Sequence, residues 1–536
     1  MNMRNRGIPA AALVVVVSAV IGGVFGRLAA TEDRVMTRYR IYVAALASVE
    51  RDYAEVVDPA QVIYGSIDGM LRTLDPHSTF FDPKSFAQMQ ERQKGNYYGI
   101  GITIQQQLNG DVMVTSLFEG TPAYRVGIRR NDVIAKVGNE SAKGWTTEDV
   151  VKRIKGPNKG STVAIGIRRP GVDSIIDLIV PRDEIHIVSV RTAFLIAPGI
   201  GYVRLQDFID TTETELKASL KKLTAAGMTR LILDLRENPG GELNQAIAVS
   251  NTFLKRGQPI VSMKGRIPQS VGNFVAEKDG DYPSLPLVVL VNRDSASASE
   301  IVSGAMQDHD RGLIVGETTF GKALVQSVFL IQEEAGLALT TAYYRTPSGR
   351  IIQRPWDATF DEYLTYGLRD QTSRPHPESE LRYTDAGRKV YGGGGIEPDH
   401  FLPGPVDGFN PSLFSRALYA RSAFINFAGH FIKAGDTSPA AAKSVARYKV
   451  APGWQVTDAM VADLKQDLLA LRYKIDEAAF AADVPFYKAM IRFEVDADLF
   501  GMEEARRNLT VVDPQAQKAL GYFDEAQKLL ELKKGK

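Results

Sequence analysis

The chain contains no cysteine, and only six histidines occur among its 536 residues. Without cysteine there can be no disulfide bond, thiolate nucleophile, cysteine-based zinc site or lipid-modified cysteine anchor. The six histidines are scattered, and no His-Glu-x-x-His spacing indicates a catalytic zinc site. A nucleophile in this chain must therefore be an oxygen atom, and we expect neither a metal nor another cofactor.

An excess of charge of either sign is also missing. The formal net charge is +1, from 64 basic and 63 acidic side chains that are mixed along the chain. Proteins that bind nucleic acid or anionic lipid through charge carry a basic stripe or patch, and this sequence has none. We therefore expect no nucleic acid among the partners.

A long hydrophobic run occurs only at the N-terminus. Two arginines among the first six residues precede an uncharged run over residues 8–25, and Leu28-Ala29-Ala30 follows. A basic flank before an apolar run is typical of an export signal or a signal anchor, and this run is just long enough to span a bilayer. The sequence predicts export to the periplasm or cell envelope. Cleavage, or retention in the cytoplasmic membrane by residues 8–25, stays open, and a buried helix of a soluble domain is the alternative.

Length and pattern divide the chain into several folding units. At 536 residues the chain exceeds the size at which one hydrophobic core keeps growing. We predict, in order, a signal or anchor, an N-terminal helical region, a β-rich domain, an α/β core and a C-terminal helical domain, over residues 1–30, 31–94, 95–184, 185–405 and 406–536. Strands and helices alternate in the fourth unit, which predicts an α/β core with an at least partly parallel sheet.

Two further patterns concern the second half of the chain. The polar stretch over residues 356–391 indicates a long surface insertion. In the C-terminal region, apolar residues at steps of three and four form one amphipathic stripe, consisting of Val461, Leu464, Leu468, Leu471 and Ile475. Such a stripe favours packing on the core and self-association equally, and docking of an adaptor is a third interpretation.

The first candidate for chemistry lies between a predicted strand and a predicted helix. The apolar strand through Val291 is followed by residues 295–300, Ser-Ala-Ser-Ala-Ser-Glu. Small residues at such a turn leave a hydroxyl exposed near the positive end of a helix, where an acyl-transfer nucleophile belongs. The candidate nucleophile is Ser297. Because serine also caps helices, simple capping is the other interpretation.

A lysine among apolar residues supplies a candidate base. Lys322 lies in residues 319–326, Thr-Phe-Gly-Lys-Ala-Leu-Val-Gln. Burial disfavours the ammonium form and lowers the pKa of a lysine, so that the neutral amine would accept a proton from a serine hydroxyl. Gln326 follows four residues later, and a helical or turn-like segment would bring its amide to the amine. A solvated lysine and a water-facing glutamine are the alternatives.

A turn closed by two glycines is the third candidate. Residues 234–241, Asp-Leu-Arg-Glu-Asn-Pro-Gly-Gly, end another predicted strand. Glycines let the backbone direct its N–H groups toward one point, as an oxyanion hole requires. We assign the Gly241 N–H as one donor and the Ala298 N–H as its partner. A plain turn at the end of a strand is the alternative.

Taken together, these three motifs resemble those of the carboxyl-terminal processing peptidases, also called tail-specific proteases. Residues 344–350 (Tyr-Arg-Thr-Pro-Ser-Gly-Arg) and 395–399 (Gly-Ile-Glu-Pro-Asp) are similar too. The resemblance implies a serine endopeptidase that forms an acyl-enzyme, with Ser297 as nucleophile, Lys322 as base and Gln326 as its companion. It also implies a multidomain α/β fold, in which a crotonase-like (ClpP-like) peptidase core carries an inserted-type PDZ-like β domain between helical N-terminal and C-terminal regions.

The β-rich domain itself resembles a PDZ domain. Residues 98–104 alternate as a single strand, and Asn109-Gly110 predicts a tight hairpin. Backbone N–H groups of a glycine-containing loop can hold a terminal carboxylate while the tail adds as a strand. The predicted tail-binding residues are Gly99, Ile100, Gly101 and Ile102. The resemblance makes proteins or peptides with apolar C-termini the expected partners.

Two other functions compete with this interpretation. A Ser/His/Asp hydrolase would use His309 or His77 as its base, but both lie in polar contexts and are expected to be exposed. The other is a catalytically silent envelope scaffold that binds protein C-termini through the PDZ-like domain, which a fold alone does not exclude. The intact Ser297, Lys322 and Gln326 favour the enzyme.

Overall fold

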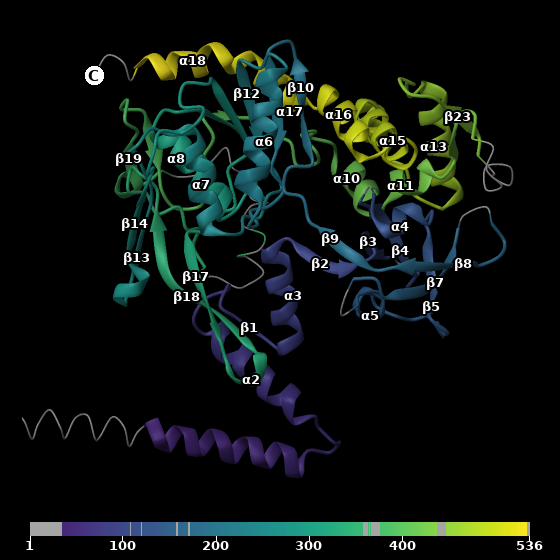
Figure 1. Ribbon diagram of the computed structural model, residues 1–536, viewed down its shortest axis with the longest axis horizontal. Helices are drawn as coiled ribbons and strands as arrows, with labels where there is room; N and C mark the ends of the chain where they lie inside the picture. Colours follow the sequence, from purple (N-terminus) through teal and green to yellow (C-terminus); the bar gives the residue numbers. More distant parts are fainter. Residues whose placement is uncertain are drawn as a thin grey trace, which may run out of the picture. The chain divides into compact units, whose positions relative to one another are not determined.

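The computed structural model describes most of the chain from residue 35 to residue 532 (Figure 1). Residues within that span that are not described are 108, 119, 157–158, 170–171, 357–362, 364, 366–375 and 437–445. The predicted signal or anchor, residues 1–30, lies outside the described residues. Among the helices that are described, none is both long and apolar enough to cross a bilayer.

The described residues form two compact units. One contains residues 35–82 and Val328–Leu339, and the other contains the remaining described residues. The segment Val328–Leu339 belongs to the first unit although it is distant in sequence, because strand β1 (Thr79–Phe81) pairs antiparallel with residues 336–338.

Helices make up most of the predicted N-terminal helical region. Residues 35–52 form one helix, and α2 (Pro59–Arg72) and α3 (Pro83–Lys94) follow. The carboxylate of Asp58 accepts a hydrogen bond from the Ala60 N–H at 2.9 Å. An aspartate N-cap followed directly by proline is a favourable start for α2.

A six-stranded sheet forms the centre of the larger unit. The strands lie in the order β10-β11-β12-β15-β16-β21. Their bounds are Thr192–Ala197, Ile200–Arg204, Arg230–Asp234, Leu287–Val291, Leu313–Gly316 and His400–Phe401. β10 is antiparallel to β11, and all other neighbours are parallel. The predicted α/β core with an at least partly parallel sheet is therefore confirmed.

Helices cover both faces of this sheet (Figure 1). Alternate residues of one strand contribute to different hydrophobic cores, since Leu233 packs with the helices of one face and Ile232 with those of the other. The first face carries α6 (Thr212–Ala225), α7 (Leu243–Phe253) and α8 (Ala298–Asp308). The second carries α17 (Pro514–Ala519) and α18 (Phe523–Leu532). The end of the C-terminal region thus packs on the α/β core.

A second sheet lies beside the first face of the core. In the larger unit it includes β13 (Pro259–Gly265), β14 (Gly272–Val275) and the end of β18 (Gly336–Arg345). β13 pairs antiparallel with both neighbours, and β17 (Leu324–Leu330) pairs with β18. β13 also contacts α8, so this sheet lies close to the predicted catalytic turn.

The β-rich domain contains a five-strand sheet in the order β3-β4-β5-β7-β8, to which β6 adds on β5, and a separate β2–β9 pair. The bounds of β2 to β9 are Asn96–Gly99, Ile102–Gln106, Val112–Leu117, Val133–Val137, Glu140–Ser141, Thr162–Arg168, Ile176–Pro181 and Asp183–His186. Its helices are α4 (Pro122–Arg125) and α5 (Thr147–Ile154). The predicted hairpin at Asn109-Gly110 is confirmed, with β3 antiparallel to β4.

The single strand predicted over residues 98–104 is wrong. The chain leaves β2 after Gly99 and enters β3 at Ile102, and the two strands have different partners. Gly101 between them has a φ of +84°, and a Cβ there would lie 2.4 Å from the Thr121 side chain. A left-handed glycine therefore bends the chain where alternation alone predicted a continuous strand.

The described end of the predicted surface insertion is ordered structure at the edge of the core. Strands β19 (Leu381–Tyr383) and β20 (Lys389–Tyr391) form an antiparallel hairpin. Arg388 forms ion pairs with Asp310 and Asp399, and both of these aspartates lie in or beside the core. Buried partners thus hold this part of the segment, which sequence composition alone did not reveal.

The C-terminal region is mainly helical, as predicted. Its elements before α17 are α10 (Leu413–Ala420), α11 (Ala423–Ala428), β22 (Phe431–Lys433), β23 (Tyr448–Val450), α13 (Asp458–Ala470), α14 (Glu477–Ala482), α15 (Val484–Leu499) and α16 (Met502–Val512). In the predicted stripe, Val461, Leu464 and Leu468 are buried and Ile475 is partly buried against the same core, whereas Leu471 is 67% exposed. Arg472, with a φ of +64°, ends the helix there.

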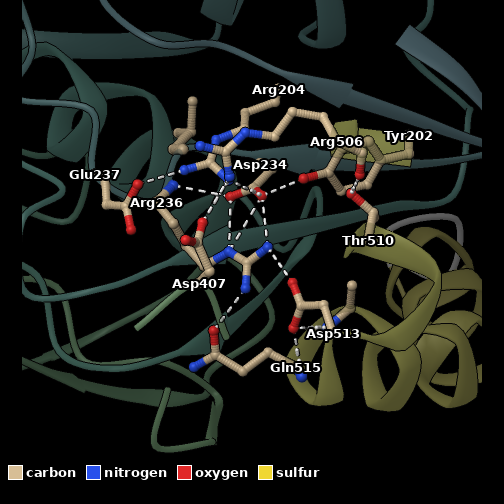
Figure 2. A network of polar contacts seen from close by, with 12 residues as sticks. Tyr202, Arg204, Asp234, Arg236, Glu237, Asp407, Arg506, Thr510, Asp513 and Gln515 are labelled. Atoms are coloured by element: carbon tan, nitrogen blue, oxygen red, sulfur yellow. Dashed lines mark hydrogen bonds and ion pairs between the residues drawn. The ribbon is translucent and has the colours of Figure 1, made fainter. Parts of the chain in front are cut away.

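A buried polar network joins the end of β12 to the C-terminal helices (Figure 2). Arg236 donates hydrogen bonds to Asp234 at 2.7 Å, to Asp513 at 2.6 Å and to Gln515 at 2.8 Å. Burial opposes ionisation of Asp234, but Arg236 and Arg204 hold its pKa below its usual range. The network therefore attaches the start of α17 to Arg236, within the segment of the predicted oxyanion turn.

Candidate active site

Ser297 lies where the sequence predicted, between a strand and a helix. It is the N-cap of α8 and follows β15 after a short turn. Its φ of 53° and ψ of −109° are unusual for a residue other than glycine. Strained backbone of this kind persists only where the surroundings hold it, and it is concentrated at functional sites.

The buried carboxylate of Glu300 holds this turn. Its Oε2 atom accepts hydrogen bonds from the Ser297 N–H at 2.8 Å and from the Lys322 N–H at 2.9 Å. Its Oε1 atom accepts from the Gly321 N–H at 2.6 Å and from the Thr319 hydroxyl at 2.5 Å. One oxygen atom thus brings the backbones of Ser297 and Lys322 together, although the two residues lie on different loops.

Our sequence analysis did not assign a role to Glu300. Glu300 follows Ser297 by three residues, which is the spacing of the acidic residue in a capping box. This spacing could have indicated that Glu300 contacts the Ser297 backbone. Burial raises the pKa of Glu300 to about 7, and its four hydrogen-bond donors oppose that rise.

Tyr344 on β18 makes a second link between the two loops. Its hydroxyl lies 2.8 Å from the Lys322 carbonyl oxygen and 3.3 Å from that of Ser297, and donates to both. The side chain is buried, and burial together with the nearby Glu300 raises its pKa. Tyr344 therefore remains a neutral donor that holds the two carbonyl groups side by side.

The Lys322 amine meets Gln326, as predicted. Its Nζ donates to the Gln326 Oε1 atom at 2.8 Å, and both side chains are half-buried. The expected helical or turn-like link is wrong, however, because Gln326 lies on strand β17. Gly321, with a φ of +89°, turns the loop so that Lys322 precedes the strand.

The glycine turn after β12 packs directly against the serine turn. A Cβ on Gly240 would lie 2.7 Å from the Ala296 carbonyl oxygen and 2.8 Å from both the Ala298 nitrogen and the Ser297 Cβ. Only glycine allows this approach, since its φ of +96° is also left-handed. The Asn238 carbonyl strengthens the contact by accepting from the Ala296 N–H at 3.0 Å.

Gly241 is held by the backbone of Phe208. The Phe208 N–H donates to the Gly240 carbonyl at 3.0 Å, and its carbonyl accepts from the Glu242 N–H at 2.9 Å. Such a parallel bridge uses the groups on either side of Gly241, so that the Gly241 N–H points away from Phe208. Its assignment as an oxyanion donor, like that of Ala298, stays a prediction.

The expectation that His309 is exposed is wrong. It is only 3% exposed and contacts Asp385 at 2.8 Å and the Pro259 carbonyl at 2.6 Å. It caps the C-terminal end of α8, whereas Ser297 caps the N-terminal end. A helix of this length, at about 1.5 Å per residue, separates the two side chains too far for proton transfer.

The predicted tail-binding residues line one pocket of the β-rich domain. Gly99, Ile100, Gly101 and Ile102 all contribute to it, and the remaining lining residues are Tyr97, Ile104, Val151, Ile154 and Lys155. The carbonyl groups of Ile100 and Gly101 accept from the N–H groups of Ala123 and Phe118. These hydrogen bonds fix the loop that lines this mostly apolar pocket.

Known proteins and family models are similar to this chain. The model described as Peptidase family S41 matches residues 199–358, and the PDZ domain model matches residues 88–168. A carboxy-terminal-processing protease of Bartonella bacilliformis is 38% identical over 309 residues, which are 57% of this chain and 70% of that protein. The carboxy-terminal processing protease CtpA of Bacillus subtilis is 32% identical over 351 residues, 65% of this chain and 72% of that protein. This chain belongs to the carboxy-terminal-processing proteases of peptidase family S41.

Among solved structures, this chain is similar to the photosystem II D1 C-terminal processing protease, which is 32% identical. The alignment covers 57% of this chain and 82% of that protein, with a TM-score of 0.34. As a carboxy-terminal-processing protease of family S41, the chain is a serine-type peptidase with a PDZ domain, and it acts on peptides or proteins. Its α/β core is the peptidase domain. The finer expectation of a crotonase-like, ClpP-like core stays a prediction.

Proposed function

We propose that Ser297 and Lys322 form the catalytic dyad of this peptidase. The observation that carries the proposal is the shared acceptor, because one oxygen of Glu300 binds the backbone N–H groups of both residues. Tyr344 reinforces this arrangement at the two carbonyl groups. The two loops are thus held together at four backbone atoms, which supports a pairing of their side chains as nucleophile and base.

In this mechanism the neutral Lys322 amine takes the proton of Ser297 while the serine oxygen attacks the peptide carbonyl. Gln326 orients the amine through a neutral carbonyl group, which adds no negative charge that would favour the ammonium form. The N–H groups of Gly241 and Ala298 stabilise the oxyanion. The lysine then gives its proton to the leaving amine, and water hydrolyses the acyl-enzyme.

We further propose that the PDZ domain holds the C-terminal tail of a protein substrate while another segment enters the dyad. The glycine loop would bind the terminal carboxylate, and the apolar pocket would take an apolar terminal side chain. Holding the tail raises the local concentration of the scissile segment.

Replacement of the two dyad residues tests the enzyme against a silent scaffold. We expect Ser297→Ala and Lys322→Ala each to abolish cleavage of an unstructured protein with an apolar tail, while tail binding persists. Cleavage products are followed by mass spectrometry. The half-buried Ser219 on α6 offers a matched control, Ser219→Ala, which should cleave normally. Cleavage that survives in Ser297→Ala would end the assignment.

Export to the periplasm or cell envelope is a proposal from residues 1–30 alone, as is retention in the cytoplasmic membrane by residues 8–25. Self-association or an adaptor contact of the C-terminal region is likewise a proposal, beside its packing on the core. Sequencing the N-terminus of the mature protein in a membrane and a soluble fraction separates cleavage from retention.

A further inference from the structure

The PDZ pocket contains one charged side chain. Of the residues that line it in the described part of the chain, Lys155 alone carries a charge, and the others are apolar, glycine or tyrosine. Lys155 follows α5 directly, and its N–H donates to the Val151 carbonyl at 2.9 Å. Its backbone is therefore fixed, while its long side chain reaches the pocket.

Within the protein, the Lys155 ammonium pairs with a carboxylate that does not line the pocket. Its partner is Glu91 on α3, and the Nζ atom also lies 4.9 Å from the centre of the Tyr97 ring. The side chains of Lys155 and Glu91 are 31% and 42% exposed. Because the pair reaches solvent, an incoming anion can replace Glu91 without either carboxylate being buried unpaired.

Another cation at this end of α5, Arg182, is already engaged. Arg182 donates to the Ile154 carbonyl at 2.6 Å and to the Arg153 carbonyl at 3.0 Å, and so caps the helix. Lys155, the charged residue that lines the described pocket, is thus suited to meet a terminal carboxylate.

We propose that Lys155 is the counter-ion of the substrate's terminal carboxylate, and that Glu91 occupies this cation until a tail displaces it. This inference rests on the proposed recognition of C-terminal tails. The exchange replaces one ion pair by another, so that the ammonium keeps a charged partner throughout. Glu91 therefore acts as an internal competitor that weakens tail binding and makes the pocket more selective for tails with a free carboxylate.

Peptide binding to the full chain tests this exchange. The probe is a fluorescein-labelled decapeptide that ends in Ala-Val-Val, made with a free carboxylate and as the C-terminal amide. All variants carry Ser297→Ala so that the peptide is not cleaved, and fluorescence anisotropy gives the dissociation constants. Circular dichroism checks that each variant is folded.

We expect three results. Lys155→Met weakens binding of the free acid about tenfold and leaves the amide unchanged, because a charge-assisted hydrogen bond is lost. Glu91→Gln tightens binding of the free acid about two- to fivefold, in line with a partly exposed ion pair. In the Lys155→Met background, Glu91→Gln has no further effect, since the competitor no longer has a cation to hold.

A matched pair on the same domain controls for charge removal. Lys136 and Asp177 form an ion pair at 2.9 Å outside the pocket, and the Lys136 side chain is 37% exposed. Lys136→Met and Asp177→Asn should leave both dissociation constants unchanged. Tail binding that is the same in Lys155→Met and Glu91→Gln as in the parent overturns this inference alone. Absence of binding by either peptide overturns the inference together with the tail recognition on which it rests, while the dyad remains testable by cleavage.

Discussion

Two buried carboxylates of the peptidase domain, Asp234 and Glu300, have different kinds of partners. Asp234 ends β12 and pairs with the guanidinium groups of Arg236 and Arg204 (Figure 2). Glu300 lies in the first turn of α8 and accepts hydrogen bonds from three backbone N–H groups and one hydroxyl. Both side chains are 0% exposed, so that the contrast between them comes from their partners and not from their burial.

The partners decide the protonation behaviour of the two groups. Burial favours the neutral form of each. At Asp234 the arginines outweigh burial and lower the pKa, whereas at Glu300 neutral donors leave the pKa raised, at about 7. The positive charges of the arginines therefore lower the pKa of a buried carboxylate, whereas several neutral donors do not.

The two arrangements also act over different distances along the chain. Arg236 connects β12 to Asp513, which lies 277 residues further on. The donors of Glu300 lie no more than 22 residues from it, and most are backbone groups. We infer that the arginines join distant elements, while the neutral donors set the backbone positions on which the dyad depends.

Among the substitutions that test this contrast, removal of an arginine should have the largest effect, and it should act on the free energy of unfolding. We expect Arg236→Met to lower the free energy of unfolding by about 3–5 kcal/mol, because it leaves Asp234 and Asp513 buried with a lost partner. Urea denaturation of the full chain measures the loss.

An exposed arginine in the C-terminal region provides the control for that variant. Arg447 also bridges two carboxylates, Asp463 and Asp467, each at 2.7 Å, but its side chain is 38% exposed. We expect Arg447→Met to change the free energy of unfolding by less than about 1 kcal/mol. Equal losses in the two variants would show that burial does not set the cost.

Replacement of Glu300 should affect catalysis more than stability. In Glu300→Gln one acceptor oxygen becomes an NH₂ group, which faces N–H donors and pushes the Ser297 and Lys322 loops apart. A misplacement of about 1 Å can cost about 10²-fold in rate, so we expect kcat to fall by that order with little change in KM. Steady-state cleavage of an unstructured protein with an apolar tail measures both.

Glu213 in the first turn of α6 provides the control for Glu300. It pairs with Lys217 at 2.7 Å near the surface, and Glu213→Gln should keep the kcat of the parent. An unchanged kcat in Glu300→Gln would mean that the shared carboxylate does not position the dyad.

Local sequence patterns predicted the parts of the fold and site that depend on neighbours in the chain. The strand Leu287–Val291 and the turn with Ser297 follow from an apolar run beside small residues. The hairpin at Asn109-Gly110 follows from its turn residues. Contact between Lys322 and Gln326 was expected, but from the wrong local conformation, because spacing by four residues suits a helix and this segment is a loop and a strand.

Features that depend on backbone angles or on distant partners were not predictable in this way. The break at Gly101 and the end of α13 at Arg472 both depend on a positive φ, which alternation and periodicity do not reveal. Arg236 contacts Asp513 only when the chain is folded. Glu91 on α3 likewise contacts Lys155, which follows α5. Only the spacing of Glu300 from Ser297 offered a local signal that the sequence analysis left unused.

The pH dependence of stability should separate the two carboxylates by the sign of their effects. The pKa of Glu300 is raised from 4.5 to about 7, so that the folded state binds more protons than the unfolded state between these values. Its contribution to stability is therefore fully present below about pH 4.5 and is lost as the pH rises to about 7, with a slope of at most about 1.4 kcal/mol per pH unit. Asp234 behaves in the opposite way, since its pKa is lowered from 3.8 and its contribution is lost only on acidification.

The difference in unfolding free energy between the wild type and Glu300→Gln isolates this group, because the variant lacks its titration. We expect the difference to fall from pH 4.5 to pH 7 and to be flat above pH 7, as measured by urea denaturation across that range. A difference that is flat from pH 4.5 to pH 7 and falls only on acidification below about pH 4.5 would mean that Glu300 is ionised in the folded state with a lowered pKa. In that case the three N–H groups and the hydroxyl would stabilise a buried charge as effectively as the arginines around Asp234, and the contrast between the two carboxylates would be one of geometry alone.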